Sequence, residues 1–400
     1  MKNTTLAFTS LVTGLLVAGQ TICGFAQTRV WTQTSAPNRP WTSMAVSADG
    51  SRVVAVAGGS QGPYPQIVGQ IHTSTNSGIT WDVTSAPTAS WNGVASSSDG
   101  RRLAAVIAFG TIYTSTNFGV TWTATTAPIA HWQSIASSGD GMKLIAVEGC
   151  ILPACDSSTA AIYTSADGGA TWTPRISVYT TFSVASSADG NHLAAASGGI
   201  TISTNAGATW ALSGAPYTGY QAVASSWDGN RLVAVSPGWR IVTSTDGGST
   251  WTQSNSPGSG WWSICSSANG STLLAGVSYG PDSIYTSSDS GATWIPNSAP
   301  TSVQWKALAS SADGNKLFAA INNGGIYTYQ SAPALTITGS NNHSVVSWPA
   351  SATGYGLQQN PHLHPTNWVT VTNTPISDGI KKEVTIPQTV ESMFFRLVNF

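Results

Sequence analysis

The chain has 400 residues, of which 15 are Lys or Arg and 16 are Asp or Glu, so its formal net charge at pH 7 is -1. This balance gives no electrostatic basis for binding nucleic acid or an anionic membrane. Charged residues make up 8% of the chain and hydrophobic residues 41%, which is enough apolar content for a large core. The composition favours an all-β protein with a neutral, hydroxyl-rich surface.

The N-terminus has the features of a secretory signal peptide. Lys2 is followed by an apolar run over residues 6–19, and small residues lie at Gly24 and Ala26. The run is too short and too close to the N-terminus for a membrane span. We therefore expect a signal peptide over residues 1–26 and a secreted protein, extracellular, at the cell surface or in the periplasm.

The cysteines suggest one disulfide. Cys150 and Cys155 flank a short loop, and an oxidising compartment would allow them to bond. Neither has a second Cys or His pair at the spacing of a metal site. We expect no metal and no cofactor.

A short phrase of the form Ser-x-Asp/Asn-x-Gly-x-Thr-Trp returns along the chain and predicts a hairpin. An Asp or Asn side chain can accept hydrogen bonds from nearby backbone N–H groups, and Gly supplies the positive φ of the turn. A catalytic acid or metal ligand would lose its charge in Asn, so the exchange of Asp for Asn favours a structural role. The six copies carry Asn76, Asn117, Asp167, Asn205, Asp246 and Asp289.

A second phrase alternates with the first and consists of an aromatic leader, an Asp-Gly or Asn-Gly hairpin signal and an apolar strand. Successive leaders are 38 to 50 residues apart, and each repeat holds four short strands, which is the period of a propeller blade. The seven leaders are Trp41, Trp91, Trp132, Phe182, Tyr220, Trp262 and Trp305.

The strand count predicts how the ring closes. There are seven leaders but six box tryptophans, and residues 29–37 match the tail that follows each box. We expect this N-terminal strand to pair with the last repeat and remove the exposed sheet edges. The prediction is a seven-bladed β-propeller over residues 27–331, followed by a small β-sandwich over residues 334–400.

The first phrase resembles the Asp box of sialidases, xyloglucan hydrolases, sortilin-type receptors and the photosystem II assembly factors. Over residues 29–330 the repeat is similar to the assembly-factor propellers, which implies seven blades. The organelle-specific function is not carried over, because the basic and acidic docking patches are absent. The strands at 346–349, 355–358 and 394–397, with Trp368, resemble the fibronectin-type-III-like tail of many secreted bacterial proteins.

Candidate ligand residues are aromatic. The leaders would stand near the central axis, on the face opposite the Asp-Gly turns, where they could stack sugars or grip a peptide. The alternative is that each leader packs as a wedge between blades, which their recurrence favours, since packing preserves repeat symmetry and a site breaks it. Three aromatic residues that do break the symmetry are further candidates for the surface: Tyr217, Trp239 and Trp261.

An enzyme is the competing hypothesis. A sialidase-like site would need three arginines, a Tyr/Glu pair and an acid, and a xyloglucan hydrolase would need paired acids. The acids outside the repeats, Glu148, Asp156 and Asp282, fall in loops of different blades. The sequence therefore favours a secreted, monomeric, non-catalytic binding or scaffold propeller that recognises a glycan or protein at the cell surface; the alternative is a glycoside hydrolase of sialidase-like or xyloglucanase-like type.

Overall fold

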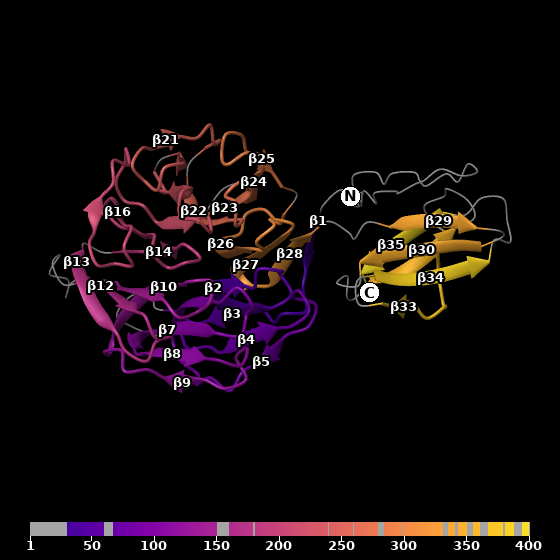
Figure 1. The fold of residues 1–400 in the computed structure, drawn as a ribbon, viewed down its shortest axis with the longest axis horizontal. Coiled ribbons are helices and arrows are strands. Elements are labelled where there is room, and N and C mark those ends of the chain that lie inside the picture. The colour runs from indigo at the N-terminus through magenta and orange to yellow at the C-terminus, as the bar shows by residue number, and fades with distance from the viewer. Residues whose placement is uncertain are drawn as a thin grey trace, which may run out of the picture. The chain divides into compact units, whose positions relative to one another are not determined.

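The regular secondary structure of the described residues consists of β-strands, with no helix (Figure 1). The strands form where β-branched and small residues either alternate with polar residues or make fully apolar runs. The computed structural model describes residues 30–59, 67–149, 160–178, 181–238, 240–258, 260–278, 284–297, 299–330, 335–340, 343–349, 355–360, 367–378, 381–387 and 394–399. Contacts divide the chain into two units, of which one is Trp31–Tyr329 and the other contains Gln330–Phe400.

The repeated unit is a four-stranded antiparallel blade. Among the described residues, three sheets of the first unit are single blades of four strands, and two sheets of eight strands each consist of two blades joined by pairing of β2 with β27 and of β7 with β10. The first three blades are β2 (Arg39–Val46), β3 (Val53–Ala57), β4 (Ile71–Ser74) and β5 (Asp82–Val83); β6 (Trp91–Ser96), β7 (Leu103–Gly110), β8 (Ile112–Ser115) and β9 (Thr123–Ala124); and β10 (Ala130–Ser137), β11 (Leu144–Glu148), β12 (Ala160–Ser165) and β13 (Thr173–Val178). The next three are β14 (Ser183–Ser186), β15 (Leu193–Ala196), β16 (Ile200–Ser203) and β17 (Ala211–Leu212); β18 (Ala222–Ser225), β19 (Leu232–Val235), β20 (Val242–Ser244) and β21 (Thr252–Gln253); and β22 (Trp261–Ser266), β23 (Leu273–Val277), β24 (Ile284–Ser287) and β25 (Ile295–Pro296).

The last blade joins the two ends of the ring. It consists of β26 (Trp305–Ser310), β27 (Lys316–Gly324), β28 (Ile326–Gln330) and the N-terminal strand β1 (Val30–Gln33). Thr34 N–H donates to the Ile326 carbonyl at 2.9 Å just beyond β1. The predicted closure by an N-terminal strand is confirmed, and Figure 1 shows the indigo start of the chain beside the orange end of the ring.

A belt of backbone hydrogen bonds ties all the blades together at the Asp-Gly turns. The residue before each turn's Asp or Asn donates its N–H to the carbonyl of the equivalent residue in the next blade, at 2.7 to 2.9 Å. The bonds run from Ala48 through Ser98, Gly139, Ala188, Trp227, Ala268 and Ala312 back to Ala48. Seven bonds complete the circle, so the ring is closed by hydrogen bonding as well as by strand pairing.

The core of each blade lies on its second and third strands and on the aromatic leader. β3, β15, β19 and β23 are buried along their whole length. In the second blade, Trp91 packs against the box residue Trp122 and edge-on against Tyr113, with centroid distances of 6.5 and 5.6 Å. This arrangement accounts for the fully apolar second strands, which are covered on both faces.

The box turns have the same geometry whether they carry Asp or Asn. In the third blade, Asp167 Oδ1 accepts from Ser165 Oγ at 2.8 Å and from Thr171 N–H at 2.9 Å. In the second blade, Asn117 Oδ1 accepts from Ser115 Oγ at 3.0 Å and from Thr121 N–H at 2.9 Å. The carbonyl oxygen common to both side chains therefore caps the turn, and the charge is dispensable for it.

The second unit is a β-sandwich. One sheet has the order β29 (Thr336–Ser340), β30 (His343–Pro349), β34 (Lys381–Pro387) and β33 (Ile376–Ser377). The other has the order β32 (Val369–Thr370), β31 (Tyr355–Asn360) and β35 (Phe394–Asn399). Buried Trp348 of the first sheet and Phe395 of the second belong to one core cluster. The sandwich is confirmed, whereas its resemblance to a fibronectin-type-III-like tail stays a prediction.

Candidate functional site: an axial cavity in the propeller

The first strands of the blades place two successive residues in opposite environments. The wedge position is the residue that packs between blades, and the axial position is the residue that follows it. In five blades the strand register shifts immediately after the wedge residue, which marks a β-bulge. A bulge leaves one residue outside the ladder and redirects its side chain. This local irregularity turns the axial residue toward the centre of the ring.

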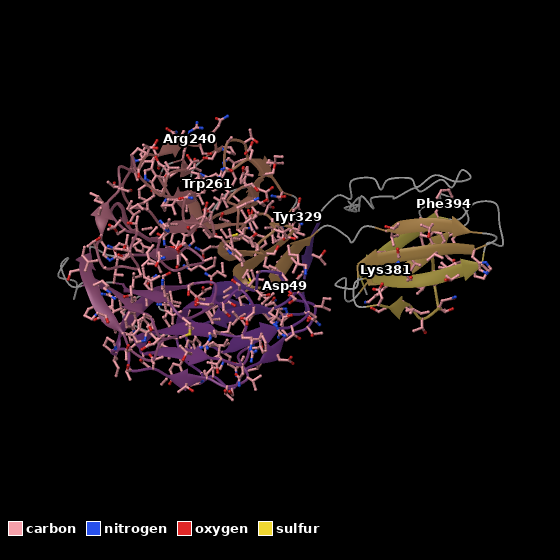
Figure 2. The ribbon with its side chains drawn as sticks, in the orientation of Figure 1. Asp49, Arg240, Trp261, Tyr329, Lys381 and Phe394 are labelled. Carbon is pink, nitrogen blue, oxygen red and sulfur yellow. The ribbon has the colours of Figure 1, made fainter. Side chains whose placement is uncertain are left out.

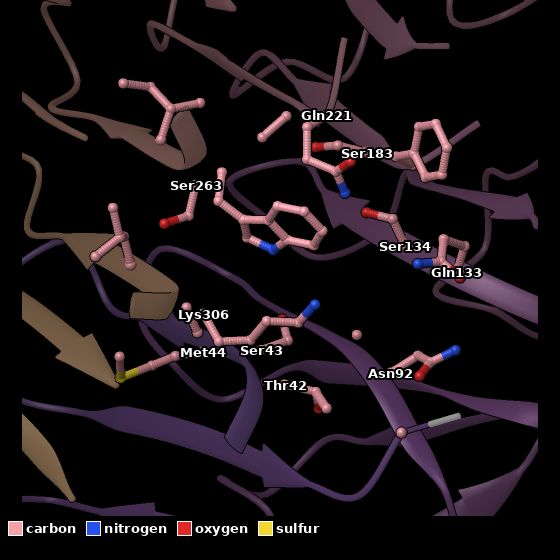
Figure 3. A pocket seen from close by; sticks show the side chains of 18 residues that line it. Thr42, Ser43, Met44, Asn92, Gln133, Ser134, Ser183, Gln221, Ser263 and Lys306 are labelled. Atoms are coloured by element: carbon pink, nitrogen blue, oxygen red, sulfur yellow. The ribbon is translucent and has the colours of Figure 1, made fainter. Parts of the chain in front are cut away.

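The axial residues line a cavity of about 210 Å³ (Figure 3). All seven blades contribute, together with Gly59 after β3. The axial residues are Thr42, Asn92, Gln133, Phe182, Gln221, Trp262 and Lys306. No two neighbouring blades contribute the same residue type, so the cavity lacks the symmetry of the fold around it.

Several polar groups at the cavity hold neighbouring blades together. Thr42 Oγ1 donates to the Trp91 carbonyl at 2.8 Å, and Asn92 Nδ2 donates to the Trp132 carbonyl at 2.8 Å. A serine that follows an axial residue also links two blades: Ser263 Oγ donates to the Trp305 carbonyl at 3.0 Å. These contacts explain the hydroxyl-rich lining as a structural feature.

Three axial side chains remain available for a ligand. Within the described part of the chain, the side chains of Gln133, Gln221 and Lys306 make no hydrogen bond and no ion pair. Figure 3 shows their polar ends directed toward the middle of the cavity. Lys306 Nζ lies 4.8 Å from the centroid of the Trp262 ring, a cation–π contact. Burial lowers the pKa of Lys306 below its ordinary value, although part of the side chain stays open to the cavity.

Six of the aromatic residues expected to form a ligand surface lie in the core. Trp41, Trp91, Trp132, Tyr220, Trp261 and Trp305 are each 0% exposed, so the expectation that they present faces to a ligand is corrected (Figure 2 labels Trp261). They fill the space between blades, where each indole or phenol ring removes a large apolar area from water. This packing is the alternative that their recurrence favoured.

The leader assignment is wrong by one residue in two blades. In the fourth blade the wedge position is Thr181, and Phe182 lies at the axial position. In the sixth blade Trp261 is the wedge, while Trp262 lines the cavity and is only partly buried. Of the seven described aromatic residues among the eight proposed for ligand binding, Trp262 is therefore the one that lines the cavity.

The other two symmetry-breaking aromatic residues lie elsewhere. Tyr217 donates its hydroxyl to Gln253 Oε1 at 2.7 Å and does not line the cavity. Trp239 lies outside the described residues, as do Cys150, Cys155, Asp156 and Asp282, so the predicted disulfide stays a prediction.

The axial residues that were not predicted from the sequence are Thr42, Asn92, Gln133, Gln221 and Lys306. Their signal is variation at a fixed place in an otherwise regular repeat. The residue after each wedge changes from blade to blade, whereas the wedge is aromatic in six blades of the seven. A binding site breaks the symmetry of the repeat, and this criterion identifies the axial residues when it is applied to the position after each wedge residue.

The acids needed for glycoside hydrolysis do not gather at the cavity. Its lining residues contain no Asp or Glu. Glu148 accepts a hydrogen bond from the Tyr163 hydroxyl, and its burial raises the pKa of the carboxyl group. Tyr163 packs edge-on against the buried Trp132 at 5.1 Å, and neither residue of the pair lines the cavity. Across the ranges that the structure describes, no cluster of three His, Cys, Asp or Glu side chains is arranged for a metal ion.

The described residues include no helix long and apolar enough to cross a membrane.

Comparison with known proteins gives a likeness in structure only. No protein-family model and no curated protein matches the sequence. The structure is similar to YCF48 from Cyanidioschyzon merolae, with a TM-score of 0.57 and 14% identity, over 75% of this chain and 98% of that one. It is likewise similar to a structure described as YCF48 bound to D1 peptide, with a TM-score of 0.57 and 14% identity, over 76% of this chain and 97% of that one. At this identity the likeness shows that the chain shares the propeller fold of YCF48.

Proposed function

We propose that the chain is a secreted, non-catalytic binding propeller whose ligand is a protein segment that enters the axial cavity. The observation that carries the proposal is the lining of the cavity by one axial side chain from each blade, with six residue types among the seven positions. A fold that repeats its packing residues and varies one inward-facing position supplies a site that can be specific for one partner. The C-terminal sandwich is proposed as an accessory module of the same extracellular protein.

The chemistry of the lining supports binding over hydrolysis. Glycoside hydrolases use two carboxyl groups that flank the scissile bond, and the lining residues provide none. Amide side chains such as Gln133 and Gln221 offer both donors and acceptors, which match the peptide group. A protein ligand is further supported by the similar propeller whose structure contains a bound peptide.

A cavity-filling variant tests the proposal. Gln221→Trp places an indole at the axial position of the fifth blade, and the sixth blade has Trp262 at the equivalent position. The control is Leu212→Trp, because Leu212 is 75% exposed on the outer strand β17. Both variants and the parent chain would be screened on a random peptide library and a glycan array.

We expect the parent chain and Leu212→Trp to retain the same peptides, and Gln221→Trp to bind them about tenfold more weakly or worse. Equal retention by Gln221→Trp would remove the cavity from the binding site. Retention of glycans alone would replace the proposed protein ligand with a carbohydrate. Release of reducing sugar from an array hit would establish the hydrolase instead.

A further inference from the structure

The axial cavity has one charged group, which makes no ion pair with the described residues. Of its 18 lining residues, Lys306 alone carries a charge. Two other cations of the propeller donate hydrogen bonds: Arg175 Nε donates to Thr164 Oγ1 at 2.6 Å, and Lys143 Nζ donates to Asn191 Oδ1 at 2.7 Å. In the part of the chain that the structure describes, the Lys306 ammonium has only the face of Trp262.

An unpaired ammonium that is partly removed from water destabilises the protein that contains it. Burial lowers the pKa of Lys306, in agreement with this cost. A packing role does not require the charge, because Met has a stem of similar length without an ammonium group. The cost of keeping an unpaired lysine is compensated if a ligand brings the opposite charge.

We propose that the axial cavity binds a single carboxylate group, paired with the Lys306 ammonium and hydrogen-bonded by the side-chain amides of Gln133 and Gln221. The proposal rests on the proposed function and specifies the chemistry of its ligand. An acidic side chain or the C-terminal carboxylate of a protein segment would supply the group.

The charge count selects a carboxylate over a phosphate group. One lysine neutralises one negative charge, and the lining residues contain no arginine and no second lysine. A phosphate monoester carries between one and two negative charges at pH 7 and would leave part of this charge uncompensated in the cavity. The two glutamine amides supply neutral donors, which suit the two oxygens of one carboxylate.

The experiment compares matched acids and neutral analogues. Binding of N-acetylglycine and of N-acetylglycinamide would be measured by thermal shift and by NMR titration of the full chain. Glucuronate and glucose form a second matched pair, which detects a sugar acid as the source of the carboxylate. The variant is Lys306→Met, and the control is Lys381→Met, which removes one charge at an exposed ion pair with Glu383 in the sandwich.

We expect N-acetylglycine to bind and to raise the melting temperature, and its amide to do neither. Lys306→Met should weaken binding of N-acetylglycine by tenfold or more, whereas Lys381→Met should leave it unchanged. Without ligand, Lys306→Met should melt no lower than the parent chain, because the variant loses a desolvated charge and keeps the stem. A folded Lys306→Met that binds the acid as well as the parent does would overturn the proposal, as would equal binding of the acid and the amide.

The outcome separates this inference from the proposed function. If the acids fail to bind while Gln221→Trp still abolishes retention of library peptides, the cavity is a binding site for a neutral segment and the carboxylate proposal is wrong. If Gln221→Trp has no effect on those peptides but N-acetylglycine binds in a Lys306-dependent manner, the anion site stands and the proposed protein ligand does not. Binding of glucuronate without N-acetylglycine would assign the carboxylate to a sugar.

Discussion

Truncation of two adjacent tryptophans in β22 should destabilise the protein to very different extents. Trp261 is 0% exposed, and its ring centroid lies 6.1 Å from that of Trp294 and 5.2 Å from that of Tyr285. Its indole N–H has no hydrogen-bond partner among the described residues, so the whole loss in Trp261→Ala comes from packing. Truncating a fully buried Trp costs about 3–5 kcal/mol. For a unit of this size the melting temperature should fall by on the order of 10 °C.

Trp262→Ala is the matched control. Trp262 faces the polar axial cavity, and its truncation enlarges a space that is already present. We expect a loss of about 1 kcal/mol or less, within the range of ordinary substitutions away from the core. Chemical denaturation followed by tryptophan fluorescence, with a calorimetric melt, would compare the two variants. Equal destabilisation, or a larger effect of Trp262→Ala, would refute the division between wedge and axial positions.

Three further predictions concern closure and acid stability. Deleting residues 29–37 should lower the melting temperature sharply, because β28 would lose its partner β1; an unchanged melt would contradict closure. Burial lowers the pKa of His72 to about 4, so the unfolded chain binds the proton more readily and stability should decline as the pH falls from about 6.5 to 4. In the variant His72→Tyr, which has the residue found at the equivalent position of the next blade, Tyr113, the melting temperature should depend less on pH between about 6.5 and 4. An unchanged pH dependence would exclude His72 as its cause. The hydrogen bonds from Thr171 lower the pKa of Asp167 to about 2, so its ionised form stabilises the fold above about pH 4 and this contribution is lost as the pH falls toward 2. Asp167→Asn should have the same melting temperature as the parent chain at pH 7 and should lose less stability than the parent between pH 4 and 2. A much lower melting temperature of the variant at pH 7 would show that the charge is required.

The architecture was accessible from the sequence because it depends on repetition. The alternation of apolar and polar residues, the Asp-Gly signals and the spacing of the leaders predicted four strands per repeat. The surplus of one leader over the box tryptophans predicted that residues 29–37 close the ring. The exchange between Asp167 and Asn117 predicted a capping oxygen, and both side chains make the same contacts. Each of these features is local or periodic, so no knowledge of the tertiary contacts was needed.

The cavity was not accessible in the same way. A bulge adds one residue to a strand, so strict alternation cannot say which of two neighbouring residues points inward. The assignment is most ambiguous for Trp261 and Trp262, because a tryptophan can occupy either the wedge or the axial position. In the fourth blade Thr181 occupies the wedge position, so the aromatic residue predicted as the leader, Phe182, lies one residue later, at the axial position. Gln133, Gln221 and Lys306 are ordinary residues on their own, and only closure of the ring gathers them.

For the proposed binding function, the wedge and axial positions divide stability and specificity between two successive residues. The wedge residue is constrained by the neighbouring blades, so a change there acts on the whole ring. The axial residue lies outside the ladder, and its substitution exchanges one contact with the cavity for another. Thr42 and Asn92 join blades through their side chains, whereas Gln133 and Lys306 make no such bond within the described residues. Under the proposed function, ligand preference can therefore change at the unbonded axial positions while the wedges and the hydrogen-bonded belt keep the propeller intact.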